Sequence, residues 1–248
     1  MKLYHVGALL AAAAGCGLVN SNTLSYTYAF DPPQSFMENF GDQANMSTVP
    51  SVACDPAAAT DTCAALLPPA MLGAATLSCD APTRMCIASV DVKLSYPVDL
   101  SMQSLPAPVV QYGIDKVTIQ KIAYWIMNNQ VNVEIPPIDL YVAGAAAKDQ
   151  NDPSAKLVGT VSKLPPKSQC TDPADPDGDP VARMQMASVC DVKLTDTGQA
   201  ALAAYAKDYK TPFQFIAHTK VIARAGEPLP TGVISFYVRP TVQFSILK

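Results

Sequence analysis

Hydrophobic and polar residues alternate along much of this chain, with the two-residue period of strands that bury one face. The clearest run covers residues 90–102, where valine, leucine, tyrosine and methionine occupy the even positions and polar residues or proline the odd ones. Pro97 lies on the polar side, where it removes a backbone donor from the strand ladder. The pattern therefore predicts a long strand with one wet face, which is an edge strand or is bulged at Pro97.

Similar but shorter runs predict further strands along the chain. They cover residues 24–30, 117–126, 131–135, 138–142, 157–163, 184–194, 213–223 and 233–246. Within 117–126, the apolar residues change from odd to even positions near Gln120 and Lys121. Such a change of phase predicts a β-bulge, because otherwise half of the strand would turn its core residues to water. Residues 36–49 show no sustained period and are expected to form a loop with at most one helical turn.

One stretch has the three-to-four-residue period of a helix. Ala201, Leu202, Tyr205 and Tyr209 fall on one stripe, and Asp196 is expected to cap its start with Gln199 as a capping-box partner. The pattern stops before Pro212. This is the only helix expected outside the N-terminal segment, and it covers residues 196–209.

Seven or eight short strands with one helix predict a mainly β fold, an antiparallel β-sandwich. Residues 117–144, in the order strand, asparagine-rich turn, strand and glycine, resemble the sandwich domain of late-embryogenesis-abundant, water-stress-type proteins. They lack the Asn-Pro-Asn of that family, and the resemblance implies a sandwich fold alone. We expect one sandwich domain over residues 24–248, with a cysteine-rich insertion at 54–86.

The first sixteen residues have the layout of an export signal. Lys2 is followed by a short apolar run to Ala14, and small residues precede Cys16. Ala13-Ala14-Gly15-Cys16 resembles the lipobox of bacterial lipoprotein precursors, which implies cleavage before Cys16 and lipid on that cysteine. The segments expected are a signal peptide, 1–15, and a lipidated leash, 16–23, that holds the protein on a bacterial membrane, the outer membrane being favoured.

Two other interpretations of this segment stay open. The lipobox pattern usually has leucine where this chain has Ala13, so cleavage by the ordinary signal peptidase after an Ala-x-Ala sequence is an alternative. A buried alanine-rich helix is the other, although Lys2 lies at its very start and polar sequence begins at Asn20.

Seven cysteines fit this interpretation, because setting Cys16 aside for lipid leaves an even number. The other six are Cys54, Cys63, Cys79, Cys86, Cys170 and Cys190. In an oxidising compartment they can form three disulfides. We predict two bridges within 54–86 and one that joins Cys170 to Cys190. Zinc is the rival interpretation, but no pair has Cys-x2-Cys spacing and the only histidines are His5 and His218.

Composition narrows the classes of partner. The chain is 49% hydrophobic and 15% charged, with a formal net charge of -4. This is a globular composition, and it lacks the basic surplus that phosphate backbones require. Nucleic acid is therefore not expected as a partner.

One acidic segment suggests calcium. Asp172, Asp175, Asp177 and Asp179 supply four carboxylates within eight residues, and calcium needs several oxygens around one point. An EF-hand would place an acid twelfth from Asp175, where this chain has Met186. The alternative is a solvated acidic turn, so calcium is the only cofactor considered.

Aromatic residues suggest a contact surface. Tyr124 and Trp125 are neighbours in a strand and must point to opposite faces, with Trp125 expected outward. Together with Tyr141 or Tyr237, an exposed Trp125 would form a patch for an envelope protein or a glycan. The alternative is that the cysteine-rich segment or the helix covers these side chains.

Familiar catalytic motifs are missing. The chain has no Gly-x-Ser-x-Gly, no His-Glu-x-x-His and no phosphate-binding glycine loop, and His218 is expected on a wet strand face. The function expected is that of a non-enzymatic cell-envelope lipoprotein that presents a binding or assembly surface. The alternatives are a carrier of an apolar ligand within the sandwich and a secreted carboxylate-dependent hydrolase.

Overall fold

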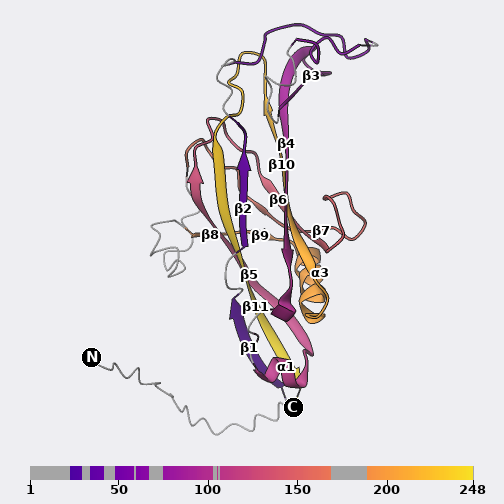
Figure 1. Cartoon of the computed structure of the whole chain (residues 1–248), viewed down its shortest axis with the longest axis vertical. Coiled ribbons are helices and arrows are strands. Elements are labelled where there is room, and N and C mark those ends of the chain that lie inside the picture. Colours follow the sequence, from indigo (N-terminus) through magenta and orange to yellow (C-terminus); the bar gives the residue numbers. More distant parts are fainter. Residues whose placement is uncertain are drawn as a thin grey trace, which may run out of the picture.

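Two antiparallel sheets pack face to face in an elongated molecule (Figure 1). The computed structural model describes residues 23–29, 34–41, 48–58, 60–66, 75–102, 105, 107–168 and 189–247. Inward side chains of both sheets join one hydrophobic cluster. The mainly β sandwich that the alternating pattern predicts is confirmed.

The first sheet is organised around its longest strand. Its strands are β1 (Thr23–Ala29), β2 (Gln34–Asn39), β5 (Lys116–Asn129), β8 (Val189–Asp191) and β11 (Val233–Leu247). Their order is β1-β11-β5-β8, and β2 also pairs with β11. β1 pairs with the second half of β11 and β2 with its first half. One edge of the sheet is thus built from two successive short strands.

The second sheet has six strands. They are β3 (Thr76–Asp80), β4 (Met85–Val98), β6 (Ile138–Gly144), β7 (Lys156–Val161), β9 (Lys193–Leu194) and β10 (Phe213–Ala223), in the order β3-β4-β10-β6-β7-β9. The described residues therefore form eleven strands, more than the seven or eight expected. The surplus consists of short strands, such as β8 and β9, which divide the predicted strand 184–194 between the two sheets on either side of Val192.

Side chains of β11 fill the core with the predicted alternation. All the residues expected on its inner face are at most 3% exposed, namely Ile234, Phe236, Val238, Val242, Phe244 and Ile246. Phe36 of β2 stacks on Phe236 with a centroid distance of 5.1 Å. Burial of this face is the main favourable contribution to folding.

The β-bulge predicted from the change of phase is confirmed. Thr241 of β11 pairs with Lys121 and Val242 with Ile119, so Gln120 has no partner in the register. A second irregularity, where Met127 is passed over, was not predicted. Because of the first bulge, Ile119 and Ile122 are both buried, although residues three positions apart point to opposite faces of a regular strand.

Pro97 lies where the pattern predicts, at an edge. β3 pairs only with residues 85–89 of β4, so the later part of β4 has a partner, β10, on one side alone. Proline is confined to such edge positions, because it has no N–H to donate to a neighbouring strand.

The predicted helix is present as α3 (Asp196–Lys207). Its N-cap is Thr195 rather than Asp196, since the Thr195 hydroxyl accepts a hydrogen bond from Gly198 N at 3.0 Å. Gly198 lies against β7 so closely that an added Cβ would come within 2.3 Å of Leu157 O. The helix packs Leu202 and Ala206 into the common core.

Four local predictions were wrong. β2 overlaps the start of the expected loop 36–49, and the short helix α1 (Ala107–Tyr112) was not expected at all, nor was the 3-10 turn η2 (Leu100–Met102) that ends the predicted strand early. Residues 131–135 form no extended strand; Ile135 makes only an isolated bridge with Leu164.

Candidate functional site

Two disulfides close the cysteine-rich insertion, residues 54–86, which we call the disulfide knob. Cys54 is bonded to Cys79 and Cys63 to Cys86, as the prediction of two bridges within this segment requires. The knob lies at the end of the molecule that carries β3 (Figure 1). Cys54 N donates to Arg84 O and Cys86 N to Val52 O, so the chain before the first cysteine joins the start of β4.

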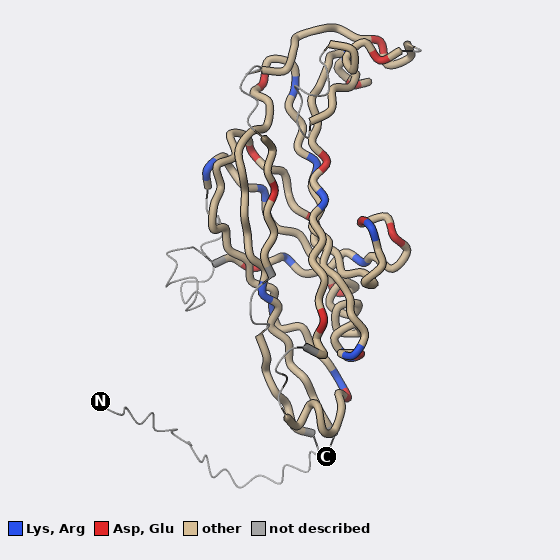
Figure 2. Tube along the Cα trace, viewed as in Figure 1, with Lys and Arg blue, Asp and Glu red and all other residues tan. Residues whose placement is uncertain are grey.

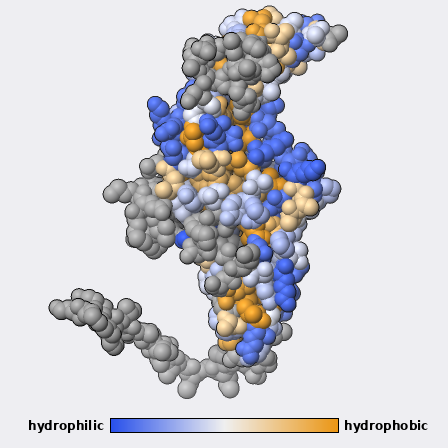
Figure 3. All heavy atoms as spheres, viewed as in Figure 1, coloured by the Kyte–Doolittle hydropathy of each residue, from blue (hydrophilic) through white to orange (hydrophobic). Residues whose placement is uncertain are grey.

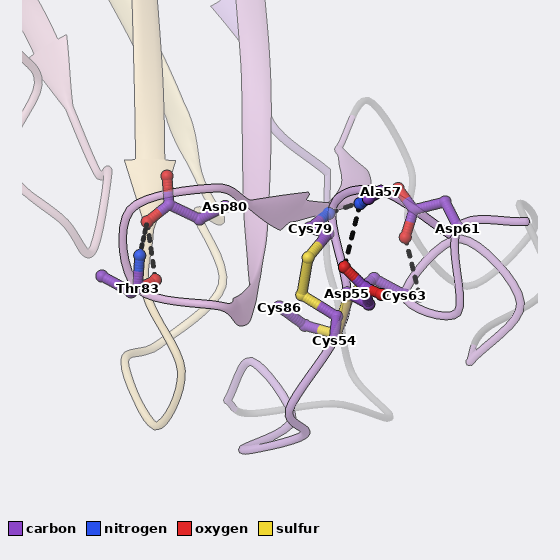
Figure 4. The surroundings of a disulfide bond; sticks show 9 residues. All are labelled: Cys54, Asp55, Ala57, Asp61, Cys63, Cys79, Asp80, Thr83 and Cys86. Carbon is purple, nitrogen blue, oxygen red and sulfur yellow. Dashed lines mark hydrogen bonds between the residues drawn. A yellow bond between two sulfur atoms is a disulfide. The ribbon is translucent and has the colours of Figure 1, made fainter. Parts of the chain in front are cut away.

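Carboxylates in the knob bind its backbone. Asp61 accepts hydrogen bonds from Cys63 N at 2.9 Å and Cys79 N at 3.2 Å, and Asp80 accepts from the Thr83 hydroxyl at 2.6 Å (Figure 4). Asp55 accepts from Ala57 N at 3.0 Å. These carboxylates fix turns of the knob.

The sulfur atoms of Cys54, Cys63 and Cys79 lie within 4.8 Å of one another. A zinc ion would need them as thiolates, whereas all three belong to disulfides. In the oxidised form the cluster therefore holds the knob together and offers no metal ligand.

Several candidate residues lie outside the described part of the chain. They are Cys16, Cys170 and the four carboxylates of the acidic segment, Asp172, Asp175, Asp177 and Asp179. Lipid on Cys16, the bridge between Cys170 and Cys190 and the calcium site consequently stay predictions. Cys190 itself lies in β8 and is buried.

The expected exposed aromatic patch is not formed. Trp125 does point away from the common core, and it stacks on Tyr237 at a centroid distance of 5.5 Å with the Arg239 guanidinium 5.6 Å from its ring. Trp125 is only 1% exposed, which agrees with the alternative that its side chain is covered. Its Nε1–H has no acceptor among the described residues.

Tyr141 lies apart from this aromatic pair. It belongs to β6 in the second sheet, whereas Trp125 and Tyr237 belong to the first, and it points to the outer face between the inward Leu140 and Val142. Burial, and then the charge of Asp139, raise the pKa of its hydroxyl. The three aromatic residues therefore do not form one contact surface.

A hollow of about 670 Å³ opens beside the end of β10, and we call it the outer hollow. Its walls come from residues 132–136, the end of β10 and the loop that follows, all far apart in sequence. The lining residues are Asn132, Val133, Glu134, Pro136, Lys220, Ile222, Ala223, Arg224, Glu227 and Pro228. No sequence motif marked it, since only the register between distant strands brings these segments together.

Hydrogen bonds hold the walls of the outer hollow. The Asn132 side chain donates to Leu229 O at 2.9 Å and accepts from Thr231 N at 2.8 Å. Glu227 accepts from Arg224 N at 2.6 Å, which closes the turn after β10. The hollow is thus a fixed feature of the fold.

The charged side chains that line the outer hollow differ in whether they have a partner. Glu134 forms an ion pair with Lys163 at 3.1 Å, and Glu227 accepts the hydrogen bond from Arg224 N that closes the turn. Lys220 and Arg224 are exposed and form no ion pair with another described residue. Ile222, which lies between them in the sequence, is 43% exposed. The hollow therefore offers two cations beside an apolar side chain.

A polar row continues from the outer hollow along the same face of β10. His218 Nε2 lies 2.9 Å from Asp91 Oδ1, and Lys93 Nζ lies 3.0 Å from Asp91 Oδ2. The hydrogen bond from Lys93, and then the one from His218, hold the pKa of Asp91 below its ordinary value, and Asp91 in turn raises the pKa of Lys93. His218 is outward, as expected, and half-buried.

Described residues enclose one small cavity between the sheets. The cavity found there has about 10 Å³ and is lined by side chains of both sheets, among them Phe40, Leu94 and Phe236. Glu38 is the one carboxylate among its described lining residues, and burial raises the pKa of that group. Such a cavity holds about one water molecule, far less than a ligand pocket.

No helix in the described ranges combines the length and the apolar character needed to cross a membrane.

Comparison with known proteins assigns no family to this chain. No family model and no curated protein matches the chain. Among solved structures, the chain is similar to one of infectious bursal disease virus, Gt strain, at 10% identity and a TM-score of 0.26. The matched region covers 98% of this chain and 36% of that chain. It is also similar to one of Mud crab tombus-like virus, at 10% identity and a TM-score of 0.29, covering 100% of this chain and 93% of that chain. Both TM-scores are too low to carry an argument.

Proposed function

We propose that this protein is an exported, lipid-anchored and non-enzymatic cell-envelope protein that presents a binding surface. The observation that carries the proposal is the pair of disulfides, Cys54–Cys79 and Cys63–Cys86. Disulfides form and persist in oxidising compartments outside the cytosol. An export signal that ends in a lipobox-like sequence at Cys16 supplies the route and the anchor.

The outer hollow is the binding surface in this proposal. Lys220 and Arg224 favour a partner with carboxylates, and Ile222 between them favours an apolar side chain on the same partner. Lys220 and Ile222 lie on one face of β10, and Arg224 follows directly after its end. A polypeptide segment that combines acidic and apolar residues fits this arrangement.

A protein partner is favoured over a glycan. Sugars are commonly bound on exposed aromatic faces, whereas the stacked Trp125 is buried and no aromatic residue lines the outer hollow. An apolar ligand held between the sheets is disfavoured by the cavity of about 10 Å³. The partner we propose is therefore another protein of the cell envelope.

Nothing in the outer hollow favours hydrolysis. The two carboxylates that line it, Glu134 and Glu227, are both exposed and already bound to Lys163 and to the backbone. We therefore assign these carboxylates a structural role.

Metabolic labelling with palmitate tests the anchor. The parent chain should incorporate label and Cys16→Ser should incorporate none. Equal labelling of the two chains would sink the lipidation proposal.

Crosslinking in intact cells tests the surface. A photo-reactive amino acid placed at Ile222 should capture one envelope protein through an acidic and apolar segment, and the double charge reversal Lys220→Glu with Arg224→Glu should abolish the product. A reactive group at Ser95, which is exposed on β4, is the matched control. Identical products from both positions, or a product unaffected by charge reversal, would overturn the assignment of the outer hollow.

A further inference from the structure

The end of the molecule opposite the disulfide knob is almost free of charge. It is formed by β1, α1 and residues 240–247 of β11, and these segments contain no Asp, Glu, Lys or Arg. We call it the tether end. Figure 2 shows few charged positions there. Asp115 and Lys116 border it, and the backbone of Asp115 is joined to β11 through Ser245 O at 2.9 Å.

Two large side chains of α1 are exposed at the tether end. Val110 is 57% exposed and Tyr112 56% exposed, while Val109, just before them, is fully buried and fixes the helix to the core. Gly113 N donates to Val109 O at 3.0 Å and ends the helix. On the face shown in Figure 3, hydrophobic residues are exposed at this end. The fold thus holds two apolar side chains outward on a rigid base.

The leash limits the distance of this end from a membrane. Cys16 is seven residues before Thr23, where β1 begins. A chain of that length spans at most about 25 Å when fully extended. Residues 17–22 are also uncharged. Lipid on Cys16 would therefore keep the tether end, and not the knob, next to the bilayer.

We propose that the tether end lies on the bilayer surface, with Val110 and Tyr112 in the headgroup region. This inference rests on the lipid anchor of the proposed function. Tyrosine suits that region because its ring is apolar and its hydroxyl stays hydrated, and tyrosine is enriched at membrane interfaces. Because β1, α1 and residues 240–247 contain no charged side chain, these segments can meet the interface while the charges at their border, such as Asp115 and Lys116, stay in water.

The orientation has a consequence for the knob. β1 and the knob lie at opposite ends of the long axis (Figure 1). With the tether end on the bilayer, the disulfide knob points away from it, and the outer hollow, near the base of the knob, faces the space in which an envelope partner is found.

Fluorescence quenching by brominated lipid tests the inference. The probe is Tyr112→Trp in the full lipidated chain, reconstituted in vesicles of phosphatidylethanolamine and phosphatidylglycerol. The matched control is Ile222→Trp, also at an exposed apolar position but in the outer hollow, and the parent chain gives the background of buried Trp125. We expect on the order of half of the added emission to be lost for Tyr112→Trp and little for the control, since only the first side chain reaches the interface.

The outcomes separate the two proposals. Strong quenching of Tyr112→Trp alone supports the inference. Weak and equal quenching of both variants in a chain that carries palmitate overturns the inference and leaves the anchor standing. A chain that carries no palmitate overturns the anchor, and the orientation that depends on it.

Discussion

The two ends of this molecule are stabilised in different ways. At the tether end, Phe244 and Ile246 are fully buried and the ring of Tyr28 lies 6.4 Å from that of Phe244. Among the described residues of the disulfide knob, Cys63 and Cys86 have fully buried side chains, and Asp61 binds the backbone. Apolar packing thus supports one end and covalent bonds the other. The knob consequently depends on an oxidising compartment.

Removing a core side chain from the tether end should have the largest effect. We expect Phe244→Ala to lower the free energy of unfolding by about 3–5 kcal/mol, because it deletes a fully buried ring. Denaturant unfolding followed by circular dichroism measures this loss. Ser245→Ala, on the neighbouring outward position, is the control. A loss below about 1 kcal/mol for Phe244→Ala would contradict the view that packing holds this end.

Opening a bridge should affect the knob alone. We expect Cys63→Ala with Cys86→Ala to destabilise the knob by about 2–4 kcal/mol, chiefly through the unfolded chain. Hydrogen exchange should rise across residues 54–86 and stay unchanged in β10 and β11. If β11 lost protection to the same extent, the two ends would form one cooperative unit and the comparison would be wrong.

A single carboxylate in the knob should have a smaller effect. Both oxygens of Asp61 accept backbone hydrogen bonds, so Asp61→Asn removes one acceptor and should cost about 1 kcal/mol. Asp55→Asn keeps the acceptor that Ala57 N uses and is the matched control. Proteolysis of the knob reports both. Equal rates for the two variants would show that the second bond of Asp61 does not stabilise the knob.

The smallest effect concerns Glu38 between the sheets. Burial raises its pKa, so the folded state binds a proton more tightly than the unfolded state and stability falls as the pH rises through the folded pKa. Because the group is only partly buried, we expect Glu38→Gln to stabilise the protein by about 0.5 kcal/mol at neutral pH. The gain should vanish below the unfolded pKa, near pH 4. Denaturant midpoints at the two pH values check this, and a gain that is the same at both would refute it.

Most of the longer strands could be predicted from the alternation of apolar and polar residues in the sequence. The inner face of β11 and the bulge at Gln120 could be predicted because burial follows directly from position within a strand. β2 could not, because Phe36 and Phe40 are four residues apart, and only pairing with the distant β11 makes this segment a strand. The six residues of α1 are too few to show a helical period.

Candidate surfaces were harder to predict than strands. The alternation gave the face of Trp125 correctly, but it carries no information on what lies over that face, and the side chain is buried. The outer hollow joins Asn132, Lys220 and Glu227, which only tertiary structure brings together. Likewise, two bridges in the knob followed from the number of cysteines, whereas the pairing of Cys54 with Cys79 depends on the folded knob.

The mass of the mature protein tests the central claim most directly. We predict that the protein purified from membranes begins at Cys16 and that its first residue carries lipid, so that the mass exceeds that of the polypeptide 16–248 by the mass of the acyl groups. A mature chain that begins at another residue, or that begins at Cys16 without added mass, would contradict the claim that this fold is held at a membrane by its tether end.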